Sequence, residues 1–149
     1  MRTTALRRSA SLAAAAAGVF AITGLALAAE KTPFASLANL ASALSQNDAD
    51  AALEYFDSNM QSYGEIEQKI EALTAQADIS CAIDIVTDVE GDGIHKLDLD
   101  WFMQLKSQTD DSQLERRRER VQVEMREIKG VWKITAFSPI GILDAIKIK

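Results

Sequence analysis

The chain has 149 residues, a formal net charge of −6 at pH 7 and a single cysteine. A net negative charge disfavours binding to nucleic acid or to anionic lipid, because both repel an acidic protein. One cysteine excludes an intrachain disulfide, and we expect Cys81 to have a structural role within a strand.

The first 28 residues have the three regions of a secretory signal peptide in the expected order. A start with three arginines precedes an uncharged apolar run at residues 10–29, which contains an Ala-x-Ala cleavage pattern at 26–28. A permanent membrane anchor is the alternative, since about 20 apolar residues can span a bilayer. The consecutive alanines and the small residues at the end of the run favour cleavage. The pair Arg7-Arg8 leaves twin-arginine export open beside the general secretory route.

We therefore expect an exported protein, periplasmic or extracellular, without a stable membrane anchor after cleavage. Residues 29–149 are enough for one domain with its own core but not for two. Removal of residues 1–28 takes away three arginines and no acidic residue, so the formal charge of −6 becomes −9.

Three helices are predicted in the first half of this domain. Thr32-Pro33 is typical of a helix cap followed by a first-turn proline, and apolar residues then recur at helical spacing from Phe34 to Leu44. Asn47 or Asp48 can cap a short second helix. The capping box Ser62-x-x-Glu65 predicts the start of a third helix, whose apolar stripe comprises Ile66, Ile70, Leu73 and Ala77.

From Ile79 onward the apolar period changes from 3.6 to 2, which predicts a meander of four antiparallel strands. A three-residue turn centred on Asp92 would place Ile83 opposite Trp101. A two-residue turn at Lys129-Gly130 would place Met125 opposite Ile134. Both registers keep the alternating apolar residues on one face of the sheet, and these are Ile79, Cys81, Ile83, Ile85, Leu97, Leu99, Trp101, Met103, Leu105, Val121, Val123, Met125, Trp132, Ile134 and Ala136.

Three N-terminal helices followed by a four-stranded meander predict a two-layer α+β domain. The order of the elements, the segment 130–134 (Gly-Val-Trp-Lys-Ile) with Phe-Ser-Pro at 137–139, the pair Met60 and Tyr63, and two arginines early in the third strand resemble small secreted bacterial members of the nuclear-transport-factor-2-like (SnoaL-like) superfamily. The resemblance covers most of residues 33–143 and implies a cystatin-like cone, in which a curved sheet wraps around helices. The superfamily usually has one or two strands between its second and third helices, where this chain has only residues 58–62.

The resemblance does not decide the function, because this fold hosts isomerases, dehydratases, hydrolases and non-catalytic binders. Enzymatic members place a carboxylate or histidine, often with a tyrosine, inside the cone. None of the inward residues predicted above is of these types, and Asp84, Asp98 and Asp100 have the opposite parity. We therefore predict a non-catalytic domain, without a cofactor, that binds a small ligand or a protein.

The alternative is a cofactor-independent lyase, isomerase or hydrolase. Its pocket would lie at the mouth of the cone and suit a small polar or anionic ligand. The residues that would line this pocket are Tyr55, Tyr63, His95, Arg117 and Glu119.

Four apolar residues have outward parity and are surrounded by charged ones: Ala82, Val86, Phe102 and Phe137. Such a patch is typical of a self-complementary contact between two copies, and the resemblance implies the same, so we expect a homodimer. The arginines at 116–120 alternate between the two faces, which indicates neutralisation of an acid-rich outer face rather than a nucleic-acid site. The acidic turn at 88–93 begins like a calcium-binding loop, but Leu99 stands where the twelfth-position glutamate is required, so we predict no metal site.

Overall fold

Helices and strands form two successive blocks in the computed structural model, which describes residues 32–110 and 113–146. The segment predicted as a signal peptide lies outside these residues, and no helix within them is long and apolar enough to cross a membrane. The elements are α2 (Pro33–Ser45), α3 (Ala49–Leu53), α4 (Tyr63–Gln76), β1 (Ala77–Gly91), β2 (Ile94–Ser107), β3 (Leu114–Ile128), β4 (Val131–Ser138) and the 3-10 turn η1 (Ile140–Leu143).

Side-chain caps start two of the helices where the sequence predicts them. Thr32 Oγ1 accepts the backbone N–H of Ala35 at 3.1 Å at the start of α2, and Asp48 Oδ1 accepts that of Ala51 at 3.1 Å at the start of α3. Ser62 precedes α4 but makes no side-chain capping bond. The predicted capping box is therefore not formed, although the helix begins at the predicted place.

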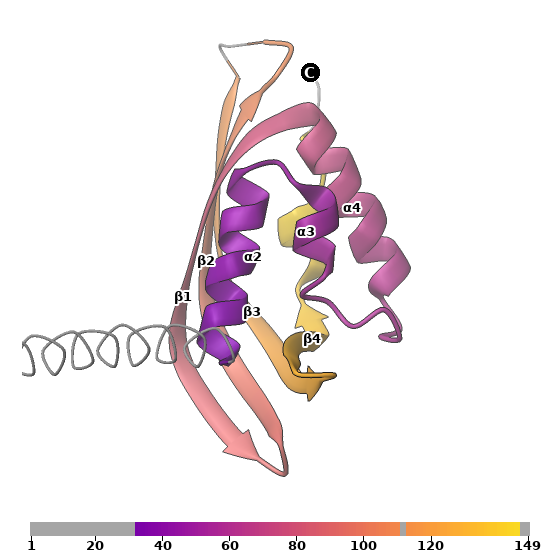
Figure 1. Ribbon diagram of the computed structural model, residues 1–149. Helices are drawn as coiled ribbons and strands as arrows, with labels where there is room; N and C mark the ends of the chain where they lie inside the picture. The colour runs from indigo at the N-terminus through magenta and orange to yellow at the C-terminus, as the bar shows by residue number, and fades with distance from the viewer. Residues whose placement is uncertain (1–31, 111–112, 147–149) are drawn as a thin grey trace, which may run out of the picture. The chain divides into compact units, whose positions relative to one another are not determined.

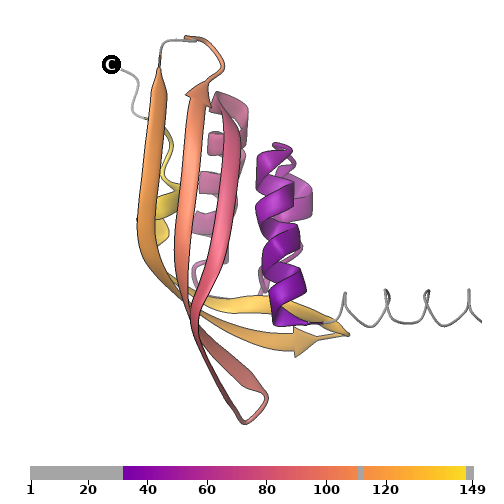
Figure 2. The ribbon, with the colours of Figure 1, turned by 90° about the vertical axis from the view of Figure 1, so that its left-hand side faces the viewer.

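The four strands form one antiparallel sheet in the order β1-β2-β3-β4, as the meander predicts. Helices α2, α3 and α4 lie on one side of this sheet (Figure 1), and we call the face toward them the inner face. Figure 2 shows that the strands bend strongly toward their lower ends. Ile83 pairs with Trp101 and Met125 with Ile134, which confirms both predicted registers.

The turn between β1 and β2 differs from the prediction. Gly91 pairs with Ile94, so the turn has two residues, Asp92 and Gly93, both at positive φ (55° and 75°) as in a type I′ turn. Ile83 still meets Trp101 because the β1–β2 register shifts at a β-bulge between Ile85 and Thr87. Beyond this bulge the parity of β1 is inverted, so that residues 88 and 90 share the inner face with their partners on β2.

A second bulge alters the end of the sheet. The β3–β4 register shifts between Glu124 and Met125, and Phe137 pairs with Val123 on the inner face. Phe137 is only 6% exposed, so its predicted place on the outer dimer face is wrong. The same shift moves Ala136 out of the predicted inner set and opposite Glu124.

The space between the inner face and the helices is filled by apolar side chains. The ring of Phe137 meets Trp101 edge-on (5.4 Å between centroids) and Phe56 at 5.8 Å. Among the residues described, the only buried polar ones are Ser36 and Ser107. The largest fully buried side chains are Trp101, Phe56, Leu40, Leu44, Ile66, Ile70, Leu73, Leu99, Met103, Leu105, Met125 and Ile134.

Residues 54–62, which join α3 to α4, contain turns and one bridge but no strand. Ile134 donates its backbone N–H to the carbonyl of Tyr55 at 2.8 Å and accepts the N–H of Asp57 at 2.9 Å. This parallel bridge at Phe56 covers the middle of the β4 edge. It lies in the segment between the second and third helices, where the resemblance implied one or two further strands.

Candidate functional site

The five residues predicted to line a single mouth of the cone lie in separate places. His95 pairs with Met125 and Arg117 with Met103, so the two rows are eight residues apart along β3, or about 26 Å at 3.3 Å per residue. Tyr63 begins α4, and Tyr55 lies at the bridge to β4. The prediction of one pocket lined by all five residues is therefore wrong.

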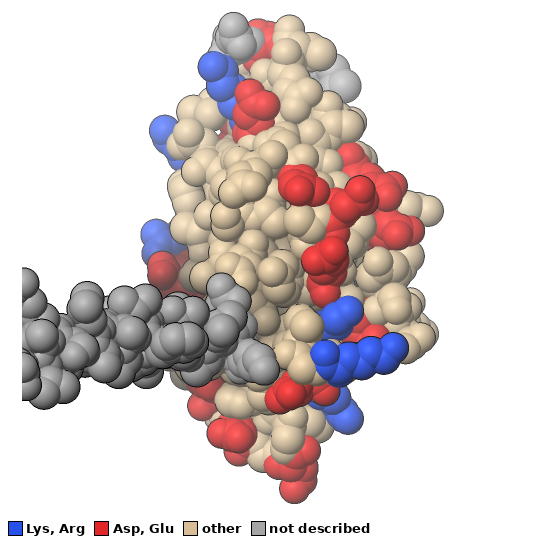
Figure 3. Space-filling view, in the orientation of Figure 1, with Lys and Arg blue, Asp and Glu red and all other residues tan. Residues whose placement is uncertain are grey.

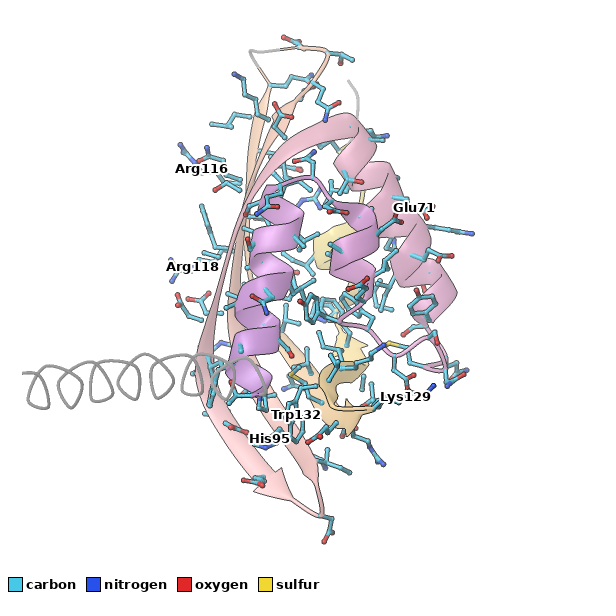
Figure 4. All side chains as sticks on the ribbon, viewed as in Figure 1. Glu71, His95, Arg116, Arg118, Lys129 and Trp132 are labelled. Carbon is cyan, nitrogen blue, oxygen red and sulfur yellow. The ribbon has the colours of Figure 1, made fainter. Side chains whose placement is uncertain are left out.

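His95, the single histidine of the sequence, lies close to two carboxylates. Its Nδ1 lies 2.9 and 3.1 Å from the two carboxylate oxygens of Asp88, and its Nε2 lies 3.8 Å from Glu90 Oε1. The imidazole also meets Trp132 edge-on at 4.9 Å, and Figure 4 shows these two side chains together at the lower end of the sheet. Asp88 reaches His95 only because the bulge in β1 inverts the face toward which the following side chains point. The two adjacent apolar residues at 85–86 are the sequence signal for that bulge.

A carboxylate that holds one imidazole nitrogen leaves the other available as a general base, which is the geometry used in many hydrolytic sites. Catalysis also needs a cavity beside that nitrogen. Neither of the two surface hollows described below includes His95 in its lining. In this structure the contact ties the two strands of the β1–β2 hairpin together.

Arg117 holds the C-terminal segment rather than facing an open pocket. Its guanidinium donates to the carbonyls of Ile142 (3.0 Å), Asp144 and Ala145 (3.3 Å), and to Glu115 Oε2 at 2.7 Å. The side chain of Arg117 is 12% exposed. This residue therefore fixes the segment after η1 on β3.

Glu119 is exposed beside Arg117, and the two residues line a small hollow of about 270 Å³ together with Arg118, Gly141 and Ile142. The donors of Arg117 are directed to the chain itself, as described above. Arg118 in turn binds the carboxylate of Asp100 through two bonds of 3.1 and 2.6 Å, which holds the pKa of that carboxyl below its usual range. This hollow thus has little free positive charge with which to hold an anion.

Two further groups, the Tyr63 phenol and the Cys81 thiol, have raised pKa values and stay protonated at neutral pH. Partial burial and the nearby carboxylates of Glu67 and Glu71 raise the pKa of the Tyr63 phenol. Burial raises the pKa of the Cys81 thiol from 9.0 to about 12, so it is a poor nucleophile. Neither group is activated for catalysis.

A larger hollow lies against the side of the sheet that faces away from the helices. Its volume is about 510 Å³, within the range of small-molecule sites. In its lining the Lys96 ammonium lies 3.8 Å from the carboxylate of Glu124, its partner on the neighbouring strand. All four strands contribute to its lining, which consists of Thr87, Val89, Lys96, Leu97, Asp98, Gln122, Val123, Glu124, Ala136, Phe137 and Ser138.

Acidic side chains gather over α3 and α4 on the helical side of the domain, as the space-filling view shows (Figure 3). Among them Glu65 approaches Lys69 at 3.9 Å, and Lys69 also contacts Asp144. No group of three potential metal ligands comes together in residues 32–110 and 113–146.

No family model and no curated protein matches the chain, so similarity is found only among solved structures. A conserved protein from Planctomyces limnophilus matches with a TM-score of 0.65 and 9% identity, over 74% of this chain and 93% of that one. A proposed scytalone dehydratase from Novosphingobium aromaticivorans matches with a TM-score of 0.63 and 10% identity, over 77% of this chain and 85% of that one. A protein of unknown function with a cystatin-like fold from Nostoc punctiforme matches with a TM-score of 0.50 and 15% identity, over 68% and 82%. At these identities the comparison shows the fold and leaves the activity open.

Proposed function

Because the chain has the nuclear-transport-factor-2-like (SnoaL-like) fold, we propose that it is an exported, non-catalytic binding domain. It takes a small ligand or a protein partner on the outer face of its sheet, without a cofactor, and works as a homodimer. Cleavage of residues 1–28 delivers it to the periplasm or the extracellular space.

The observation that carries this proposal is the content of the cone. A reaction inside it would need free space and an ionisable group directed at the substrate. Instead Trp101, Phe56 and Phe137 fill its centre, and the buried residues among those described include no carboxylate, histidine or tyrosine. The hollow large enough for a ligand lies outside, where Thr87, Gln122 and Ser138 offer hydrogen-bonding groups.

The outer face also supports the proposed dimer. Ala82 and Phe102 pair side by side on this face, and Val86, four residues further along β1 at the bulge, is 46% exposed. Arg118 and Asp100 form an ion pair next to Phe102. An apolar centre with a charged border is a pattern that two copies can share across a two-fold axis.

The alternative function, a cofactor-independent lyase, isomerase or hydrolase, has one specific observation in its favour. His95 is oriented by Asp88 in the manner of a general base. Some structural neighbours are proposed enzymes, among them the scytalone dehydratase named above. In this reading a substrate would bind at the lower end of the inner face, beside Trp132.

Native mass spectrometry of the mature protein, purified gently from the export compartment, tests the proposal. We expect the mass of a dimer of residues 29–149. Phe102→Asp should give a monomer, because it buries a charge in the contact, whereas Phe34→Asp, at an exposed apolar residue of α2 on the helical side of the sheet, should leave the dimer intact. A retained small molecule should be lost in Gln122→Trp, which fills the outer hollow.

Two results would contradict the proposal. One is a wild-type protein that stays monomeric at all concentrations and carries no adduct. The other is an adduct that survives Gln122→Trp but is lost in His95→Gln, which would favour the enzymatic alternative.

A further inference from the structure

Among the strands that the structure describes, β1 is the first of the sheet and pairs only with β2, so its other edge has no neighbouring strand there. Side chains from the end of α2 satisfy the first part of this edge. Asn47 Nδ2 donates to the carbonyl of Ala77 at 2.5 Å, and its Oδ1 accepts the N–H of Ile79 at 3.1 Å. Ser45 Oγ accepts the N–H of Cys81 at 3.0 Å. We call residues 77–81 the capped edge.

Residues 83–90 form the remainder, which we call the open edge. Since the N–H of Cys81 faces away from β2, the backbone groups of Ile83 and Ile85 do so too, because this direction alternates along an antiparallel ladder. In the part of the chain that the structure describes, no group bonds to them at this edge. Every residue from 86 to 91 is exposed, and Figures 1 and 2 show the β1–β2 hairpin projecting beyond the helices.

The open edge combines exposed apolar side chains with acidic ones. Val86 and Val89 are 46% and 65% exposed, and Asp84, Asp88 and Glu90 lie between and beside them. β1 contains neither lysine nor proline, two residues that commonly block strand edges. The neighbouring helix α2 has no charged residue at all.

We infer that the open edge binds an extended segment of a partner protein in which basic residues alternate with apolar ones. Such a segment adds a strand to β1 and bonds to the backbone groups of Ile83 and Ile85. Its apolar side chains lie beside Val89, and its basic side chains face the carboxylates, of which Asp88 and Glu90 have the opposite parity to Val89 along β1. The bulge after Ile85 limits regular pairing to a few residues on each side, so the added strand does not lead to open-ended sheet growth.

A second copy of the same chain is a poor occupant of this edge. Pairing β1 with β1 would bring Asp84, Asp88 and Glu90 of both copies into one ladder, where like charges destabilise the contact. The inference rests on the proposed binding function and deepens it, because it assigns the protein partner a strand edge, which borders the outer hollow at Val89, and a charge. A small ligand or the second subunit would still use the outer face.

Titration of the isotope-labelled mature protein, followed by the NMR shifts of its backbone amides, tests the inference. The probe is a short synthetic peptide in which lysine and valine alternate, and the matched control has glutamate in place of each lysine. A third peptide has N-methylated valines and so lacks the donors that pair with a strand edge. We expect only the first peptide to bind and to shift the amides of residues 83–90.

Charge variants sharpen the test. Asp84→Lys should weaken binding of the lysine peptide by about fivefold, whereas Glu127→Lys, the same change on the β3–β4 hairpin, should leave it unchanged. Equal losses in the two variants, equal binding of the glutamate peptide, or no binding would overturn the inference. Shifts confined to the outer hollow, at Gln122 and Ser138, would overturn the edge assignment while the proposed binding function stands.

Discussion

The capped edge and the open edge belong to one strand but differ in what satisfies their backbone. On the capped edge, Asn47 and Ser45 replace a neighbouring strand with four hydrogen bonds to β1. On the open edge, none of the described residues plays that part. Two side chains can thus satisfy the backbone of one part of an exposed strand edge and leave the rest of that edge available for association.

The largest expected effect comes from removing the main cap. Asn47→Ala loses the bonds to Ala77 and Ile79 and places alanine at a φ of 56°, where a Cβ is strained. We expect the free energy of unfolding to fall by about 3 kcal/mol, measured by denaturant titration. Asn47→Gly separates the two causes, since it keeps the backbone conformation and should lose about 2 kcal/mol. A loss below about 0.5 kcal/mol in both variants would show that the cap is dispensable.

The next effect concerns the clamp that Arg117 forms by binding the carbonyls of residues 142–145. Arg117→Met removes the donors to the carbonyls of Ile142 and Ala145, and we expect a loss of about 2 kcal/mol. Limited proteolysis should then cut in the segment that follows Pro139, where we expect the wild type to resist. The stability of Arg117→Lys should lie between that of the wild type and that of Arg117→Met, because an ammonium cannot make the paired hydrogen bonds of a guanidinium. Wild-type resistance in Arg117→Met would refute the clamp.

A smaller effect is expected at the end of the capped edge. Ser45→Ala frees the Cys81 amide, so its hydrogen exchange should accelerate toward the rate expected for Ile83 and Ile85, with a loss of about 1 kcal/mol in stability. Ser42→Ala, on the same helix but without a bond to β1, is the control. Unchanged exchange at Cys81 would mean that Ser45 does not close the edge.

The smallest effect at neutral pH is a pH dependence, which appears only in alkaline solution and reports burial at the same boundary. Burial raises the pKa of the Cys81 thiol from 9.0 to about 12. The unfolded chain therefore releases this proton first, and the contribution of the thiol to stability is present below pH 9 and is lost as the pH rises toward 12. We expect iodoacetamide to label Cys81 at pH 8 only after denaturation, and Cys81→Ala to flatten the alkaline fall in stability. Rapid labelling of the folded protein would contradict this.

Much of the sheet could be predicted from the sequence, because alternating apolar residues specify one face and turn residues specify the hairpins. Ile83 opposite Trp101 and Met125 opposite Ile134 follow from this pattern. The two bulges could not be placed, since one extra residue leaves the alternation intact on either side. Their trace is a pair of adjacent apolar residues, at 85–86 and at 136–137.

The prediction of the candidate site was affected most, because the two bulges were not predicted. Strict alternation along the strands predicted Phe137 on the outer face and no acidic side chain on the inner face. In the structure Phe137 is buried and Asp88 contacts His95. The role of Arg117 depends on carbonyls 25 to 28 residues away along the chain, which no local pattern contains. Contacts of that range are set by tertiary packing alone.

Binding outside a filled cone can be tested at the indole N–H of Trp101. Trp101 is fully buried at the centre of the cone, whereas Gln122 and Ser138 line the outer hollow. The measurement is an NMR titration of the mature protein with a set of small polar and aromatic metabolites. The account predicts that signals of the outer face move while the Trp101 indole signal stays in place. A saturable shift of the Trp101 indole, with the outer face unchanged, would show that the cone opens to a ligand and would contradict the claim.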